Sequence, residues 1–166
     1  MSKHKEKEEK TNVMRVLEQQ KIPYTPHAYE HEEGVAVDGI SVARSLGQDP
    51  EQVFKTLVAR GASRGIYVFV IPVADSLDLK KSARAVKEKS IELVAVKEIN
   101  GLTGYIRGGC SPIGMKKQYP TVFHETAEIV DSIMVSAGKI GLQVELAPDA
   151  LIGLVGASTA DVTVEP

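Results

Sequence analysis

The segment of this sequence best suited to bring its backbone close to a ligand is a glycine-rich loop. It reads Gly108-Gly109-Cys110-Ser111-Pro112-Ile113-Gly114. Adjacent glycines let the main chain approach a ligand and turn its N–H groups inward, where they can cradle a polarised carbonyl or an oxyanion. The same residue types also form ordinary tight turns. The loop is therefore a candidate oxyanion or carbonyl site, with a plain turn as the alternative.

Lys55 is the charged residue whose neighbours most favour a functional role. It lies between Phe54 and the run Thr56-Leu57-Val58, where a helical turn is expected to give way to an apolar strand. A lysine in this setting is expected to be partly enclosed, and an enclosed ammonium is costly unless it meets an anion or an oxygen-rich ligand. The alternative is a strand-edge lysine that only discourages edge pairing.

A second segment of small residues, Ser136-Ala137-Gly138-Lys139-Ile140-Gly141, follows another expected strand. It is placed either to line the opposite wall of the same cleft or to form an ordinary hairpin turn. Cys110 is a weaker candidate as a nucleophile, because its sequence context contains no histidine placed to activate it. His27 and His31 share one face of an expected strand with Tyr29, but no third ligand accompanies them, so no metal site is predicted.

The single cysteine and the charge distribution limit the class of protein. One thiol forms no intramolecular disulfide, and the sequence has no Cys/His ladder for zinc, which suits a reducing cytosol. Residues 44–117 hold thirteen basic against seven acidic residues, and residues 118–166 hold one against seven. The basic middle favours a phosphate-bearing partner, with a solvated lysine-rich helix face as the alternative. Its clusters are Lys80, Lys81, Arg84, Lys87 and Lys89, and Arg107, Lys116 and Lys117.

The elements that must position these residues alternate between helices and strands. Helices are expected to begin after the capping residues Thr11, Asp38 and Asp78, at Pro148, and as a helical turn over 97–102. Strands are expected over 55–60, 66–72, 91–95, 105–107, 121–124, 132–135 and 142–146. The first two read as a hairpin. We predict an α+β single domain whose mixed sheet curls toward a barrel, with helices packed outside.

The domain is expected over residues 11–157, between a charged flexible tail over 1–10 and a C-terminal tail over 158–166, which is expected to be either a terminal strand or disordered. The first ten residues have no apolar core for a signal peptide. No later segment approaches the roughly 18 apolar residues of a membrane span. We therefore expect a cytoplasmic protein without membrane attachment.

Taken together, these segments resemble the YbaK/EbsC family, free-standing relatives of the editing domain inserted in bacterial prolyl-tRNA synthetases. The resemblance covers residues 11–157, which is nearly the whole chain. The segments that carry it are Tyr29-Glu30-His31, Val53-Phe54-Lys55-Thr56-Leu57, Asp78-Leu79-Lys80-Lys81, 103–117, and Val135-Ser136-Ala137-Gly138-Lys139. The Gly-Gly-x-Ser-Pro-x-Gly-x-Lys-Lys form looks like the branch that removes cysteine from tRNA(Pro), rather than the branch that removes alanine.

The resemblance implies a hydrolase for mischarged Cys-tRNA(Pro), since a pocket that accepts proline rejects the similarly sized cysteine poorly. In the family, the thiol of the substrate attacks its own ester while the protein orients and polarises the reacting atoms. This agrees with a sequence that lacks a Ser-His-Asp or Cys-His set. The implied partner is the 3′ end of aminoacyl-tRNA(Pro), with prolyl-tRNA synthetase as a further candidate. No cofactor is implied, and the resemblance predicts no particular oligomeric state.

By this resemblance, Lys55 anchors the backbone or terminal phosphate of the substrate, and Gly109 and Ser111 act with it at the scissile carbonyl. The residues expected to bind the substrate are Tyr29, Thr56, Gly108, Ser136 and Gly138. Two positions depart from the family pattern: Cys110, where an aliphatic residue is common, and Gln143, where an acidic residue is expected. The alternative function is a non-catalytic aminoacyl- or nucleotide-binding module, or a synthetase-associated regulatory module, of the same fold.

Overall fold

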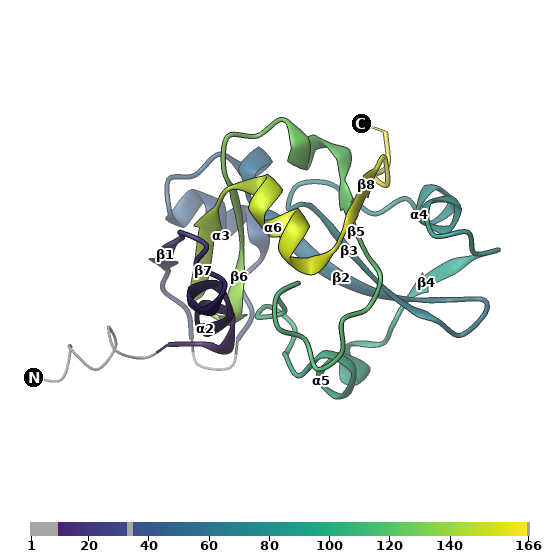
Figure 1. The fold of residues 1–166 in the computed structure, drawn as a ribbon, viewed down its shortest axis with the longest axis horizontal. Coiled ribbons are helices and arrows are strands. Elements are labelled where there is room, and N and C mark those ends of the chain that lie inside the picture. The colour runs from purple at the N-terminus through teal and green to yellow at the C-terminus, as the bar shows by residue number, and fades with distance from the viewer. Residues whose placement is uncertain (1–9, 33–34, 166) are drawn as a thin grey trace, which may run out of the picture.

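The computed structural model describes residues 10–32 and 35–165 (Figure 1). Its helices are α2 (Asn12–Gln19), α3 (Gly39–Ser45), α4 (Leu79–Ala85), α5 (Val96–Thr103) and α6 (Pro148–Val155), with the short 3-10 turns η1 (Pro50–Gln52) and η2 (Glu125–Glu128). Its strands are β1 (Thr25–Ala28), β2 (Phe54–Gly61), β3 (Ile66–Pro72), β4 (Ile91–Leu93), β5 (Thr121–His124), β6 (Ile133–Lys139), β7 (Leu142–Leu146) and β8 (Ser158–Ala160).

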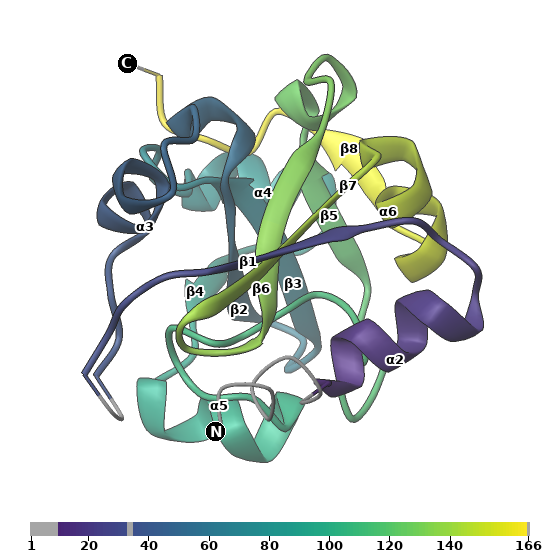
Figure 2. The same ribbon diagram turned by 90° about the vertical axis from the view of Figure 1, so that its left-hand side faces the viewer.

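Two sheets form the framework of the molecule. The five-stranded sheet has the order β4-β2-β3-β5-β8, and the three-stranded sheet has the order β1-β7-β6. The predicted hairpin is confirmed as β2 and β3, which pair Lys55 with Ile71, whereas β3, β5 and β8 run parallel. Figure 2 shows the β6–β7 hairpin in front of β2 and β3, and the bridge between Val53 and Met134 joins the two sheets there.

The predicted α+β class is confirmed, but the two sheets do not close into a barrel. The five-stranded sheet has free edges at β4 and β8, and the three-stranded sheet has free edges at β1 and β6. In the part of the chain that the structure describes, neither β4 nor β8 pairs with a strand of the other sheet. The two sheets are joined by the bridge between Val53 and Met134 and by the core that they share.

The main core lies between the two sheets and beneath α2 and α6. Alternate side chains of β3 point to opposite faces, so Val68 and Val70 belong to this core. Phe69 and Ile71 belong to a second cluster with Ala83 of α4. The unbroken apolar run of β3 therefore reflects a strand that is covered on both faces.

Side-chain caps start three helices at the predicted residues. The side chains of Thr11, Asp38 and Asp78 each accept a hydrogen bond from the backbone N–H three residues on, at 3.2, 3.1 and 2.9 Å. These bonds satisfy N–H groups that the helices themselves leave unpaired. Within the described residues, no helix is long and apolar enough to cross a membrane.

One segment differs from the sequence-based expectation. The strand predicted over 105–107 is wrong, because Tyr105 makes its bonds within its own loop: its N–H donates to Thr103 Oγ1 (3.0 Å) and its hydroxyl to the Ile113 carbonyl (2.5 Å). Beyond residue 157 the chain does not leave the fold at once. There β8 pairs with β5, and Val162 is fully buried. Most of the expected N-terminal tail, residues 1–9, lies outside the described residues.

Candidate active site

Most of the residues predicted for the site meet at one small cavity of about 100 Å³. Those that line it are Tyr29, Lys55, Thr56, Gly108 and Ser136. They come from the segment after β1, the start of β2, the loop after α5, and β6. The start of β2 reaches β6 through the bridge between the two sheets, so the sheet framework itself places these distant segments together.

The rest of the cavity wall comes largely from residues that the sequence did not connect with the site. These are Val37, Gly39, Val42, Phe54 and Val73, with Cys110 and Gln143. A Cβ on Gly39 would overlap the side chain of Val73, so the start of α3 packs directly on the chain that leaves β3. The apolar positions of α3 look like ordinary core positions in the sequence. The glycine directly after its cap is the one signal that hints at a close approach.

Gly108 is a position in the loop where a side chain does not fit. Its φ is +86°, and a Cβ there would lie 2.7 Å from the Cβ of Ala36. Both the left-handed backbone and the contact with Ala36 therefore require glycine. The loop lies against the segment before α3, and this contact closes one side of the cavity.

We expect Gly108→Ala to destabilise the protein more than Gly156→Ala. Gly156 has φ +65° with nothing within 4 Å of its Cβ position, so it carries the backbone cost of about 1–2 kcal/mol without the clash. Thermal unfolding of both variants isolates the steric part of the effect at Gly108. Equal stability losses would contradict the close approach to Ala36.

Three predicted residues do not line the cavity. Ser111 is fully buried, and its hydroxyl accepts a hydrogen bond from the Ile113 N–H (3.3 Å). A Cβ on Gly109 would lie 2.8 Å from the Cα of Lys139, so the two small-residue segments pack backbone against backbone. Gly138 has φ +101°, and its N–H donates to the hydroxyl of Ser136 (3.1 Å). These residues shape the loops that present Gly108 and Ser136.

Lys55 lies in this wall as a partly buried ammonium. Burial lowers the pKa of Lys55, and the negative charge of Asp75 opposes that shift. Among the residues that the structure describes, Lys55 has no hydrogen bond and no ion pair. A cation that has lost part of its hydration without gaining a partner favours an anionic or oxygen-rich ligand.

Two neutral polar groups in the same wall also lack partners. Thr56 and Gln143 line the cavity, and their side-chain atoms Thr56 Oγ1 and Gln143 Oε1 are buried and make no hydrogen bond within the described part of the chain. Gln143 is 7% exposed, so it is not hydrated from the surface. Buried polar atoms are paired in the great majority of cases. The cavity therefore offers a cation, an amide oxygen and a hydroxyl to whatever fills it.

The other titratable groups of the wall are held in their neutral forms. Burial raises the pKa of Cys110 to about 11 and also raises the pKa of Tyr29. A thiol with this pKa is protonated at neutral pH, and only the thiolate is a good nucleophile. Cys110 therefore contributes shape to the cavity, as the sequence-based interpretation expects.

The two histidines considered as metal ligands have separate partners. His27 Nε2 lies 2.8 Å from Glu145 Oε1, whereas the ring of His31 lies 6.2 Å from the ring of Tyr29. Over residues 10–32 and 35–165, no cluster of His, Cys, Asp and Glu is arranged to hold a metal ion.

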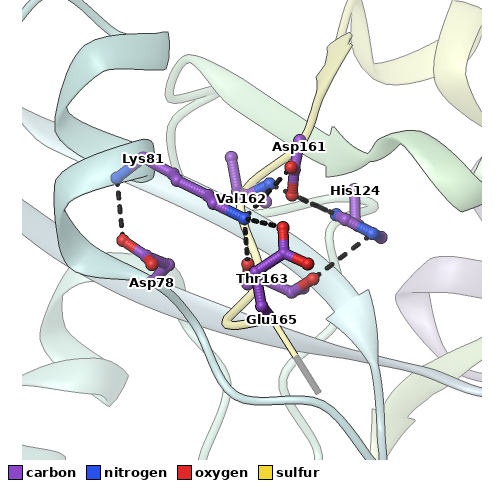
Figure 3. A network of polar contacts seen from close by, with 7 residues as sticks. All are labelled: Asp78, Lys81, His124, Asp161, Val162, Thr163 and Glu165. Atoms are coloured by element: carbon purple, nitrogen blue, oxygen red, sulfur yellow. Dashed lines mark hydrogen bonds and ion pairs between the residues drawn. The ribbon is translucent and has the colours of Figure 1, made fainter.

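A larger hollow of about 480 Å³ lies on the C-terminal side and is lined by acidic residues, among them Asp75, Glu125, Asp161 and Glu165. Figure 3 shows the network beside it, in which Lys81 Nζ donates to Asp161 (3.0 Å), Glu165 (3.1 Å) and the carbonyl of Thr163 (2.8 Å). Because Asp161, Thr163 and Glu165 are all bound by Lys81, this network fixes the C-terminal segment.

Comparison with known proteins gives a consistent picture. A family model described as an aminoacyl-tRNA editing domain matches residues 36–154. A protein of Enterococcus faecalis named "Putative Cys-tRNA(Pro)/Cys-tRNA(Cys) deacylase EbsC" is 47% identical over 159 residues, which is 96% of each chain.

Two solved structures share the fold. The first is described as a "putative trans-editing enzyme for prolyl tRNA synthetase", with a TM-score of 0.78 and 23% identity over 95% of this chain and 100% of that one. The second is described as "hypothetical protein APE2540", with a TM-score of 0.82 and 21% identity over 93% of this chain and 100% of that one. At these identities the likeness concerns the fold alone.

Proposed function

We propose that this chain, which belongs to the family of aminoacyl-tRNA editing domains, is a trans-editing hydrolase that removes cysteine from mischarged Cys-tRNA(Pro). The near full-length similarity to a protein named as a deacylase of cysteinyl-tRNAs supports this substrate. The 3′ end of tRNA(Pro) is the part that enters the cavity. The reaction takes place in the cytoplasm, with prolyl-tRNA synthetase as the partner that releases the mischarged tRNA.

The observation that carries the proposal is the group of unpartnered polar atoms in an otherwise largely apolar cavity. Lys55 brings a partly dehydrated positive charge, and Thr56 and Gln143 bring a hydroxyl and an amide oxygen without partners. An aminoacyl ester on a terminal ribose has a matching set of groups. Its phosphate is an anion for Lys55, and its ammonium is a donor for the oxygen of Gln143.

The proposed chemistry needs no nucleophile from the protein. The thiol of the substrate loses its proton, and its sulfur attacks the carbonyl carbon of the ester. The bond from that carbon to the ribose oxygen breaks, and the ribose oxygen takes up the proton. Cysteine leaves as a cyclic thioester, which water opens to free cysteine. The protein supplies orientation and polarisation, which agrees with the protonated state of Cys110 and the burial of Ser111.

The direct test is release of the amino acid from purified aminoacyl-tRNAs by the isolated protein. We expect turnover of Cys-tRNA(Pro) and no acceleration above spontaneous hydrolysis with Pro-tRNA(Pro), which has no thiol. Parallel reactions with Cys-tRNA(Cys) and Ala-tRNA(Pro) define the specificity. Tight binding of Cys-tRNA(Pro) without release of cysteine would instead identify a non-catalytic binding module.

A further inference from the structure

We infer that the acceptor end of the tRNA is held by three cations around the C-terminal end of α5. These residues, Arg107, Lys116 and Lys117, are called the α5 patch below. The inference deepens the proposed function and rests on it, because it assigns the surface that guides the aminoacyl ester into the cavity. The ligand chemistry is the phosphate backbone of a nucleic acid, which basic side chains bind without reading its sequence.

The α5 patch adjoins the cavity through the chain itself. Arg107 directly precedes Gly108, which lines the cavity. The backbone N–H of Lys116 donates to the Thr103 carbonyl at the end of α5 (3.0 Å). Lys117 lies over the ring of Tyr119, whose hydroxyl donates to the Leu102 carbonyl (2.7 Å). Lys116 and Lys117 therefore lie at the C-terminal end of α5, and Arg107 follows four residues after that end, directly before the cavity wall.

The positive charges of the α5 patch are not neutralised by neighbouring carboxylates. Arg107, Lys116 and Lys117 are exposed, and within the described ranges none of them forms an ion pair. Lys116 makes a hydrogen bond of 3.4 Å to the Gly101 carbonyl, which leaves its charge in place. By contrast, Lys81 of the other basic cluster contacts both Asp161 and Glu165.

The other basic cluster, on α4 and just after it, is poorly placed to serve the cavity. Figure 1 shows α4 at one end of the long axis of the molecule and α3, whose Val42 lines the cavity, at the other end. A tRNA whose 3′ end enters the cavity would have to cross the molecule to reach α4. The two basic clusters look equivalent in the sequence. Because of where the cavity lies, the α5 patch is placed to serve it and the cluster on α4 is not.

Acidic residues mark the side that the tRNA would avoid. The large hollow on the C-terminal side is lined by Glu125, Asp161 and Glu165, and Lys81, which pairs with the last two, leaves these carboxylates in excess. In Figure 1, β8 and the C-terminus lie at the top of the molecule and α5 lies at the bottom. Repulsion of phosphates on one side and attraction on the other orients an approaching polyanion before contact.

The loop that joins the α5 patch to the cavity is fixed before any ligand binds. The Tyr105 hydroxyl donates to the Ile113 carbonyl (2.5 Å), and the Asn12 side chain donates to the Gly114 carbonyl (3.1 Å). A surface that is already ordered loses less conformational freedom on binding. Phosphate contacts made here therefore position the ester relative to Gly108.

The test compares two triple variants that remove the same number of charges. One is Arg107→Ala/Lys116→Ala/Lys117→Ala in the α5 patch, and the control is Lys80→Ala/Arg84→Ala/Lys89→Ala around α4. For each we measure kcat/KM with Cys-tRNA(Pro) and with a cysteinyl ester of adenosine, which has no phosphates, at several salt concentrations. The affinity for uncharged tRNA(Pro) is measured separately.

In the α5 variant we expect the ratio of kcat/KM for the tRNA to that for the adenosine ester to fall about 10-fold or more at low salt. The slope of log kcat/KM against log salt should flatten by about 2 to 3, since each phosphate contact contributes about 0.7–0.9. The control variant should keep the ratio and the slope of the unmodified protein. An unchanged α5 variant, or an equal loss in the control, overturns the inference.

Failure of the proposed function has a different signature from failure of this inference. A protein that releases no cysteine from either substrate refutes the deacylase proposal. In that case, loss of affinity for uncharged tRNA(Pro) only in the α5 variant still supports the α5 patch as a tRNA surface. An active protein whose affinity for tRNA(Pro) is the same in all three forms refutes the patch alone.

Discussion

Replacement of Lys55 by methionine is expected to lower kcat/KM for Cys-tRNA(Pro) by about 100-fold or more, because the variant loses the one cation among the described residues that line the cavity. Methionine keeps the length of the side chain and removes the partly buried charge. At neutral pH the protein should therefore fold with equal or greater stability. A loss of activity without a loss of stability is the combination expected of a binding residue rather than a structural one.

The pH dependence of stability provides an independent check on Lys55. Burial lowers its pKa in the folded state, so the unfolded chain binds more protons between the lowered pKa and the ordinary lysine value. In the unmodified protein, the free energy of unfolding gains a contribution as pH rises through that window. Lys55→Met should not show this increase in the free energy of unfolding. The matched control is Lys80→Met on the exposed surface of α4, which should leave turnover unchanged. Normal turnover by folded Lys55→Met would refute the assigned site.

Exchange of the substrate thiol for a hydroxyl is expected to slow deacylation by about 100-fold or more. A cysteine thiol is a few per cent ionised at neutral pH and is intrinsically nucleophilic, whereas a serine hydroxyl is essentially not ionised. Cys110 in the wall is protonated and Ser111 is buried away from the cavity, so neither is placed to replace the missing sulfur.

The measurement compares kcat/KM for Cys-tRNA(Pro) and Ser-tRNA(Pro), with S-methylcysteinyl-tRNA(Pro) as a third substrate. The methylated substrate keeps the sulfur but cannot form a thiolate, so it should react as slowly as the serine ester. Rapid cleavage of either analogue would show that water or a protein group attacks the carbonyl, and the substrate-assisted mechanism would be abandoned.

The sequence predicts those parts of the fold whose causes are local. Thr121–His124 and Leu142–Leu146 are strands with the predicted bounds, and the helix after Asp78 begins at its cap. Tyr105–Arg107 was predicted wrongly because its composition suits a strand, whereas the partners of Tyr105 lie within the loop. The predicted barrel does not form, because among the described strands neither β4 nor β8 pairs with a strand of the other sheet.

In the candidate site, too, the sequence predicts the residues whose role follows from their type and neighbours, but not those that only the fold places there. Lys55, Gly108 and Ser136 were predicted from their residue types and neighbours, and the structure brings them to one cavity. Val42 and Val73 line it as well, but an apolar residue at a cavity looks the same in a sequence as one in the core. Gln143 was noted for its departure from the family pattern. Within the described residues its side-chain oxygen lacks a hydrogen-bond partner, and the sequence does not show this because it depends on the pairing of β7 with β1.

The pairing of β1 with β7 has a consequence for how the protein acquires its activity. This pairing sets His27 against Gln143 and carries Tyr29 to Gly141, and the bonded side chains of His27 and Glu145 are 118 positions apart. Closing so long a loop costs entropy before its contacts repay it, whereas the β2–β3 hairpin closes locally. We therefore expect a refolding chain to regain ligand binding, which needs Tyr29 in the cavity wall, only after the β2–β3 hairpin has formed. We also expect binding to be lost when β1 separates from β7, while the central hairpin is still intact.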